Sequence, residues 1–292
     1  MMSTKDLTII ITTFKSEDKI RNCLNSINKD YKVINVENSN NLIYKEKIEK
    51  EFKNVECILS KENAGYGKAN NIGITKVKTK YALILNPDTE IFPDTIDIFF
   101  KIAEEKKDFA IIQPNTITDK KDLNSSTQYL NQNNEGNATE LSEKLLSRVR
   151  GHAMFINISQ FENIGFFDEK IFFFLEETDL AKRLLINRKK IFFCESIFVF
   201  HEGGQSHKKN INHQMELSRN WHWMWSSFYY NKKYRGWFIS LLLFIPNLLS
   251  SSFKFLIFFI LKNNKKKEIY YQRLSGLVNS IIGKTSWFRP KV

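Results

Sequence analysis

LTIIITTF, at residues 7–14, is a continuous run of apolar and β-branched residues. Such a run predicts a strand that is buried on both faces, as in a parallel sheet. Outward from it, segments of strand character alternate with segments of helical periodicity to about residue 115. We expect further strands at 31–36, 55–59, 81–85 and 109–113, and helices at 17–27, 41–52, 64–77 and 93–106. This alternation predicts an α/β fold with a Rossmann-like, mostly parallel sheet flanked by helices, which binds ligands beyond the carboxyl ends of its strands.

The next segment, 116–150, is polar and rich in Asn, Gln and Ser. We expect a long mobile loop there, with one short helix. Strand character returns at 151–158, and amphipathic periodicity predicts a helix over 176–187. Two further strands are expected at 190–194 and 197–200.

The net charge of +12 is concentrated at the C-terminal end of the chain. Residues 231–292 contain twelve Lys and Arg residues and one acid, Glu268, whereas the first 230 residues are nearly neutral. An acidic partner is therefore expected to meet the C-terminal quarter of the protein.

The same region is rich in aromatic residues between 221 and 230, and 236–261 is strongly apolar. The apolar stretch is long enough to cross a bilayer, but it contains Pro246 and the costly Lys254. We favour two short helices, broken at Pro246, that lie in or dip into the membrane interface; a true span and a buried soluble helix pair are the alternatives. The lysines at 262–267 fit an anionic leaflet. The sequence thus predicts a domain at 1–215 and a helical membrane-association segment at 216–292, which contacts the membrane surface through 221–267.

The three cysteines, Cys23, Cys57 and Cys194, are far apart in the sequence. An odd, sparse set argues against a disulfide framework and against a zinc site, and favours a reduced, cytoplasmic setting. The opening MMSTKD leads directly into the first apolar run, so we expect no signal peptide.

Three segments contain candidate functional residues. The glycines of 63–73 fall at a strand-to-helix junction, where a backbone can approach a ligand closely or simply make a tight turn. Asp88 directly follows the apolar strand YALIL, where it could bind a hard cation or serve as an ordinary turn residue. Glu176 and Glu177 begin a helix after an aromatic run; the helix dipole favours acids there, and burial beside aromatics would suit a general base.

On these segments the sequence resembles the family 2 inverting glycosyltransferases with the GT-A fold, especially the bacterial rhamnosyltransferase-like branch. The resemblance covers about residues 6–206 and includes the polar end of the first strand and five motifs in order. The matching motifs are Glu37-Asn38-Ser39, NAGYGKANNIG at 63–73, Asn86-Pro87-Asp88, GFFDEKIFFFLEETDL at 165–180, and HEGGQS at 201–206.

The resemblance implies a role for each matching residue. Glu177, where the family usually has Asp, would be the catalytic base, and Asp88 and His201 would hold Mg²⁺ or Mn²⁺ against the donor diphosphate. The nucleotide sugar would be bound by Thr12, Phe14, Glu37, Asn63, Gly65, Lys68, Asn86 and Glu176. The loop 116–150 would close over the donor or the acceptor.

The implied function is the transfer of a sugar, with rhamnose as a candidate, from a nucleotide-diphosphate donor such as dTDP-rhamnose or a UDP-sugar. The acceptor would be a hydroxyl of a glycan or a polyprenyl-diphosphate-linked glycan, with inversion, in cell-surface polysaccharide synthesis. We expect the enzyme at the cytoplasmic face of the membrane, peripheral or interfacially anchored. The alternatives are a non-catalytic scaffold of a glycan-assembly complex and a nucleic-acid-binding protein; the apolar tail argues against a nucleic-acid partner.

Overall fold

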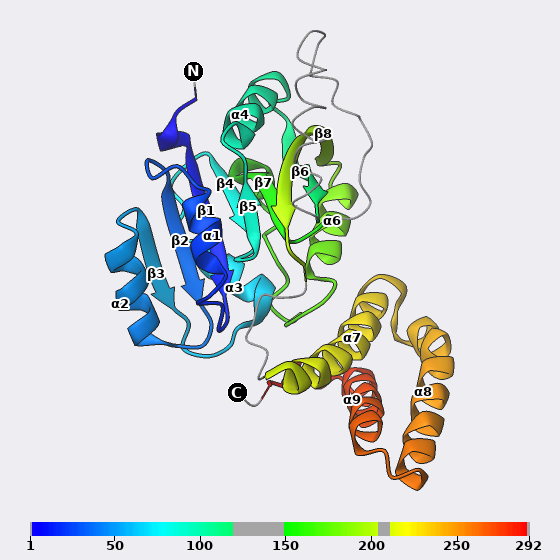
Figure 1. The fold of residues 1–292 in the computed structure, drawn as a ribbon. Coiled ribbons are helices and arrows are strands. Elements are labelled where there is room, and N and C mark those ends of the chain that lie inside the picture. The colour runs from blue at the N-terminus through cyan, green and yellow to red at the C-terminus, as the bar shows by residue number, and fades with distance from the viewer. Residues whose placement is uncertain (1, 119–148, 204–210, 291–292) are drawn as a thin grey trace. The chain divides into compact units, whose positions relative to one another are not determined.

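The computed structural model describes residues 2–118, 149–203 and 211–290. Within these residues, the strands form one eight-stranded sheet in the order β3-β2-β1-β4-β7-β6-β8-β5 (Figure 1). The strands are β1 (Leu7–Thr13), β2 (Lys32–Glu37), β3 (Val55–Leu59), β4 (Tyr81–Leu85), β5 (Thr89–Ile91), β6 (Phe109–Ile117), β7 (Ala153–Asn157) and β8 (Lys190–His201). The predicted loop 116–150 lies almost wholly outside the described residues.

The sheet is parallel in its N-terminal half and mixed beyond it. Strand β1 pairs in parallel with β2 and β4, and β2 pairs in parallel with β3. Strand β7 is antiparallel to both β4 and β6, and β5 is antiparallel to β8. The α/β fold is therefore confirmed, with an antiparallel insertion beyond the first four strands.

Strand β8 is one element, whereas we predicted two strands at 190–194 and 197–200. Its pairing with β6 shifts register after Pro114, whose partner is Cys194, so that Asn115 pairs with Phe198. Proline has no N–H to donate and is found at such irregularities. The polar residues Glu195 and Ser196 therefore occupy a bulge within a continuous strand.

The helices flank the sheet on both faces. They are α1 (Ile20–Asn25), α2 (Leu42–Glu51), α3 (Gly65–Ile74), α4 (Thr95–Glu105) and α6 (Glu176–Ile186), with short 3-10 turns η1 (Thr4–Asp6) and η3 (Ile158–Phe161). Alternate residues of a strand face opposite sides of a sheet. Ile9 and Ile11 of β1 accordingly belong to the core that includes α1, α2 and α4, whereas Ile34 and Val36 of β2 pack with Ala69 of α3.

The chain divides into two compact units. The sheet unit contains 2–64, 69–118, 149–167 and 180–203. The second unit, here called the helical unit, contains the described residues 211–290 together with Gly65–Lys68 and Asp168–Asp179. Its long helices are α7 (Asn212–Arg235), α8 (Trp237–Ile260) and α9 (Asn264–Ile281).

Helix α8 runs through Pro246 without a break, so the predicted pair of short helices is wrong. An interior proline costs about 3 kcal/mol and usually kinks a helix. Here Phe244 and Ser251, on either side of the proline, are both buried, and Phe244 packs with Phe228 of α7 and Leu277 of α9. Packing on both sides of Pro246 keeps the two halves in one helix. By length and composition α8 could cross a membrane, and its most apolar window is only 11% buried, which disfavours a buried soluble helix pair.

Candidate active site

The carboxyl ends of β1 and β2 meet at one edge of the sheet. In the register of these parallel strands Thr13 lies beside Glu37. Thr12 is nearly buried, and its hydroxyl donates to the Asn70 side chain at 3.4 Å. Phe14 follows β1 and is half-buried, and its backbone N–H donates to the Ser16 hydroxyl at 3.3 Å. The predicted donor residues Thr12 and Phe14 therefore stand at the edge where an α/β sheet binds its ligands.

Glu37 ends β2 with its carboxylate engaged by the loop that follows. One carboxylate oxygen accepts hydrogen bonds from the Ser39 backbone N–H at 2.9 Å and the Ser39 hydroxyl at 2.6 Å, and the other accepts from the Asn41 N–H at 2.9 Å. The residue is only 2% exposed. The Glu37 carboxylate therefore holds the loop after β2 in place. A nucleotide base bound here would contact that loop.

Asp88 follows β4 and has a buried carboxylate. Its side chain is 2% exposed, and its Oδ1 atom makes no hydrogen bond to any described residue. The facing group is Nε2 of His201, at 3.4 Å from Asp88 Oδ1. Antiparallel pairing of β5 with β8 places His201 opposite Thr89, next to Asp88. A buried carboxylate oxygen without a donor is costly, and a cation is the kind of ligand that removes the cost.

His152 completes this part of the site and was not predicted. Its ring stacks on that of His201, with centroids 4.4 Å apart and planes at 11°. Its Nε2 is in a hydrogen bond with the Thr116 hydroxyl at 2.8 Å, and its carbonyl accepts from the Asn86 N–H at 2.9 Å. Burial, and then the neighbouring His201 and Arg150, lower the pKa of His152 to about 3. A neutral His152 thus supports His201 without repelling a cation.

In the helical unit, Gly65 lies against the segment Asp168–Asp179. Its φ is +79°, and a Cβ placed there would lie 2.2 Å from the Phe172 carbonyl oxygen. That oxygen accepts a hydrogen bond from the Tyr66 N–H at 3.2 Å. Only glycine tolerates both the left-handed backbone and the close approach. Gly65 of the glycine-rich motif is therefore needed for packing against the acidic segment.

Glu176 and Glu177 open helix α6 after a strained turn. Phe174 and Leu175 have φ values of +68° and +70°, a region that costs non-glycine residues about 1–3 kcal/mol each. Burial and then the charge of Glu177 raise the pKa of Glu176 well above the usual range. Burial also raises the pKa of Glu177. Glu176 is 3% exposed, and its Oε2 makes no hydrogen bond to any described residue, whereas Glu177 is only half-buried.

The acidic pair is anchored by α7, through residues that sequence reasoning missed. Lys233 donates to both Asp168 and Asp179, with Nζ–O distances of 2.7 Å to each, so one lysine ties together the two ends of the segment that carries the pair. Ser226 donates to the Phe173 carbonyl at 2.8 Å. Lys233 belongs to the basic tail, where the sequence predicted contact with the membrane surface.

Three further residues were predicted to bind the nucleotide sugar. Asn63, Lys68 and Asn86 are all half-buried. Within the described residues no group of three or more His, Cys, Asp or Glu side chains is arranged to hold a metal, so Asp88 and His201 are a pair of candidate ligands. The three cysteines are buried and free.

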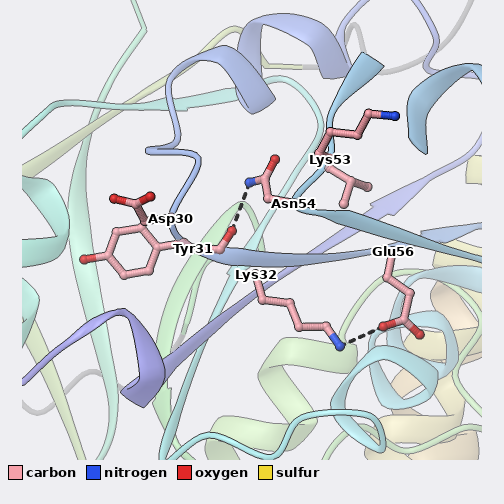
Figure 2. Close-up of a pocket in the computed structure, with 7 residues that line it drawn as sticks. Asp30, Tyr31, Lys32, Lys53, Asn54 and Glu56 are labelled. Carbon is pink, nitrogen blue, oxygen red and sulfur yellow. Dashed lines mark hydrogen bonds and ion pairs between the residues drawn. The ribbon is translucent and has the colours of Figure 1, made fainter. Parts of the chain in front are cut away.

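One cavity of about 350 Å³ lies away from these residues (Figure 2). Lys32 and Val55, the first residues of the parallel strands β2 and β3, both line it, so it lies at the amino ends of the strands. An ion pair between Lys32 and Glu56, at 2.7 Å, lies beside it. This edge is opposite to the one with Thr12, Glu37 and Asp88, so the cavity is not part of the candidate site.

Comparison with known proteins gives the family of the chain. Residues 8–161 match the family described as Glycosyl transferase family 2. A hexosyltransferase of low-salt glycan biosynthesis, Agl10 of Haloferax volcanii, is 27% identical over 214 residues, which cover 67% of this chain and 67% of that one. The rhamnosyltransferase WbbL of Escherichia coli is 25% identical over 220 residues, covering 66% of this chain and 82% of that one.

The solved structure of a mannosyltransferase from Pyrobaculum calidifontis, in complex with GDP-Man and Mn²⁺, has a similar fold. Its TM-score is 0.54 at 9% identity, over 94% of this chain and 87% of that chain. At this identity the likeness shows the GT-A fold alone. The fold and the family match together define a glycosyltransferase, an enzyme of glycan synthesis. The chain belongs to glycosyl transferase family 2.

Proposed function

We propose that this enzyme transfers a hexosyl group from a nucleotide-diphosphate sugar to a hydroxyl of a growing glycan, with inversion at the anomeric carbon. The observation that carries the proposal is the buried Asp88 carboxylate, at the ligand-binding edge of the sheet and facing His201, one oxygen of which has no hydrogen-bond donor among the described residues. It fits a donor diphosphate bound through a divalent cation.

Asp88 and His201 would hold Mg²⁺ or Mn²⁺, and Asn86 stands one position before Pro87-Asp88. Oxygen and imidazole ligands suit either ion. When bound, the cation would neutralise the charge that develops on the departing diphosphate. The likeness to a GT-A structure that contains Mn²⁺ supports this choice. Thr12, Phe14, Glu37, Asn63, Gly65 and Lys68 would position the nucleotide and the sugar.

Glu177 would act as the general base. Burial raises the pKa of both adjacent glutamates, and the pKa of the fully buried Glu176 is raised well above its usual range, so Glu177 is the member of the pair that would ionise first. Glu177 accepts the proton of the acceptor hydroxyl while that oxygen attacks the anomeric carbon. The bond to the nucleotide diphosphate breaks on the opposite side of the sugar ring, and the configuration inverts. Protonated Glu176 can still donate a hydrogen bond to the donor sugar.

The donor and the acceptor are inferred from the name of one relative and from the composition of the tail. One relative is named a rhamnosyltransferase, which favours a rhamnosyl donor such as dTDP-rhamnose over a UDP-sugar. The apolar, basic tail favours a polyprenyl-diphosphate-linked acceptor at the cytoplasmic face of the membrane, in polysaccharide synthesis. In this proposal residues 1–215 perform the transfer and 216–292 associate with the membrane.

The experiment begins with a thermal-shift screen of nucleotide sugars, with and without Mn²⁺, since a ligand that binds the native state raises Tm. Transfer to a lipid-linked acceptor is then measured with the donor that shifts Tm most. Asp88→Asn should abolish the Mn²⁺-dependent part of the shift, whereas the matched control Asp94→Asn, at an exposed position, should retain it.

The Glu177→Gln variant tests the chemistry separately from binding. It should bind the donor as the wild type does and lose transfer by about 10²- to 10⁴-fold. The exposed Glu46→Gln is its control. A product that keeps the donor's anomeric configuration, or equal activity of Glu177→Gln and wild type, would overturn the proposal; equal background in both would instead indicate a non-catalytic scaffold.

A further inference from the structure

Helix α8 presents an unbroken apolar stripe to solvent. The residues of the stripe are between 39% and 75% exposed. They are Phe238, Leu242, Ile245, Leu249, Phe253, Leu256 and Ile260. At 100° per residue all seven lie within about 40° of one line along the helix. An exposed apolar surface of this length, with no polar residue on its line, indicates an interaction site.

The amide and ammonium side chains of α8 face the other way. On the same helical wheel, Asn247 and Lys254 lie roughly opposite the stripe, about 140–160° away. The Lys254 ammonium lies over the ring of Tyr270 in α9, 5.3 Å from its centroid. Ser240 and Ser251, on the side that packs against the other helices, are buried. The mid-helix lysine is therefore directed to α9 and away from the stripe, which accommodates its charge without placing it in an apolar medium.

Cations surround the C-terminal end of this helix. Lys262, Lys265 and Lys266 are exposed, and Lys266 lies 5.0 Å from the ring centroid of Phe258. At the other end Trp237 is 44% exposed, and its indole N–H donates to the Ile281 carbonyl at 3.0 Å. Lysines with aromatic residues at the edge of an apolar surface complement an anionic lipid interface.

Helix α9 runs antiparallel along the whole of α8. Contacts join Trp237 to Ile281 at one end and Phe258 to Tyr270, with ring centroids 5.5 Å apart, at the other. Between them Phe244 packs with Leu277. If α8 crossed a bilayer, α9 would have to cross beside it.

That crossing is unfavourable, because the sides of α9 are polar. Arg273 donates to the Asn220 side chain at 3.2 Å, and Asn279 donates to the Ser275 carbonyl at 2.8 Å. Lysines 265–267 lie in its first turn, and Glu268 follows them. Charged and amide side chains of this kind are costly in hydrocarbon. The packing of α8 on α9 is compatible with a helix that lies in the plane of the interface.

We propose that α8 lies parallel to the membrane surface, with its seven-residue stripe in the acyl-chain boundary of a bilayer that contains anionic lipid, and with α7 and α9 on its water side. This inference deepens the membrane association included in the proposed function and rests on it. It selects an in-plane, non-spanning helix over a transmembrane one, and it names the surface that enters the lipid.

Depth measurements on the full chain test the orientation. Single cysteines are introduced as Phe238→Cys, Leu249→Cys and Ile260→Cys and labelled with an environment-sensitive fluorophore; the native cysteines are buried. Quenching by lipids spin-labelled at known depths, in vesicles of phosphatidylcholine and phosphatidylglycerol, should report one shallow depth for all three positions. A spanning helix would instead place Leu249 near the bilayer centre and the other two near opposite surfaces, and that result would overturn the proposal.

Vesicle co-sedimentation tests the surface. The double variant Leu249→Glu/Phe253→Glu should bind vesicles more weakly than the wild type, by about tenfold or more for each substituted residue, because each substitution removes apolar area from the lipid contact. The control Ile43→Glu changes a residue of α2 that is 79% exposed and should bind as the wild type does. Omitting phosphatidylglycerol should weaken binding by about fivefold for each lysine near the surface.

Two further results would contradict the proposal. Concentration-dependent dimers without lipid, abolished by the double variant, would show that a second copy of the chain covers the stripe. Equal vesicle binding by the double variant and the wild type would show that another surface binds lipid. Both assays are run without donor or acceptor, so their outcome is independent of whether the proposed sugar transfer is correct.

Discussion

Glu177 differs from the family's usual aspartate by one methylene, and its pKa is raised by burial. A general base works in its deprotonated form, so a raised pKa moves the loss of activity to higher pH than for an ordinary glutamate. We expect kcat to fall as pH decreases through a value above the usual glutamate pKa. Glu177→Asp should retain measurable transfer, because it restores the family's residue, whereas Glu177→Gln should not. A kcat profile that is flat through the acidic range would contradict this role.

Glu176 gives a prediction about stability. Its folded-state pKa is raised, so the folded protein holds a proton at pH values where the unfolded chain has released it. The free energy of unfolding therefore falls as pH rises from the ordinary glutamate pKa toward the raised one, by about 1.4 kcal/mol per pH unit. Glu176→Gln removes this dependence. The Tm of the Glu176→Gln variant minus the Tm of the wild type should increase from acidic to alkaline pH. A Tm difference that stays constant with pH would show that the Glu176 carboxyl ionises normally.

At the residue scale, the acids could be predicted because each comes within three residues after the end of an apolar run that positions it. Asp88 comes after a strand with all five residues buried, and Glu176 follows an aromatic segment. His152 and Lys233 could not be predicted. Their roles depend on partners far away in the sequence, His201 for one and Asp168 and Asp179 for the other, and no local pattern distinguishes them from ordinary surface residues.

The junction between Gly65 and the acidic segment can be tested at the scale of elements. The Gly65→Ala variant would place an alanine in a left-handed backbone conformation and bring its Cβ into overlap with the Phe172 carbonyl. The Gly165→Ala variant, at φ +71°, would add only the backbone strain, because no described atom lies within 4 Å of a Cβ at that position. We expect Gly165→Ala to cost about 1–2 kcal/mol and Gly65→Ala about 3 kcal/mol or more, because strain and overlap add. Urea unfolding of both variants measures the difference. Equal losses would mean that the loop at Phe172 moves aside without cost.

Strands β3 and β4 were predicted at their true bounds, whereas the bounds of most other predicted strands and helices differ by one to four residues. Strands β3 and β4 begin and end where their apolar runs do. Local breakers misled the prediction twice, at Pro246 in α8 and at Glu195-Ser196 in β8. In both cases the neighbouring elements hold the chain in register, and packing of that kind overrides a local preference.

For the whole molecule, composition predicted a boundary near residue 215, but it could not show which distant segments pack with the tail. The helical unit contains Asp168–Asp179, because Ser226 and Lys233 of α7 hold that segment. The Arg289 guanidinium also lies 3.8 Å from the ring centroid of Phe172. These contacts join residues more than 50 positions apart, which no sequence period records. Helices α7 and α9 therefore belong to the same compact unit as Glu177, the proposed base, and help to hold it in place.

A truncation tests whether the tail holds the proposed base in place or serves only to associate with the membrane. Deleting residues 212–292 removes the partners of Asp168, Phe172, Phe173 and Asp179. We expect the truncated chain to lose transfer to a water-soluble acceptor by about 10²-fold or more, as for loss of the base itself, because Glu177 is no longer held. Leu249→Glu/Phe253→Glu is the matched comparison, since it changes only exposed side chains of α8 and should retain that activity. If the tail served solely to reach the membrane, both proteins would transfer sugar to the soluble acceptor equally well.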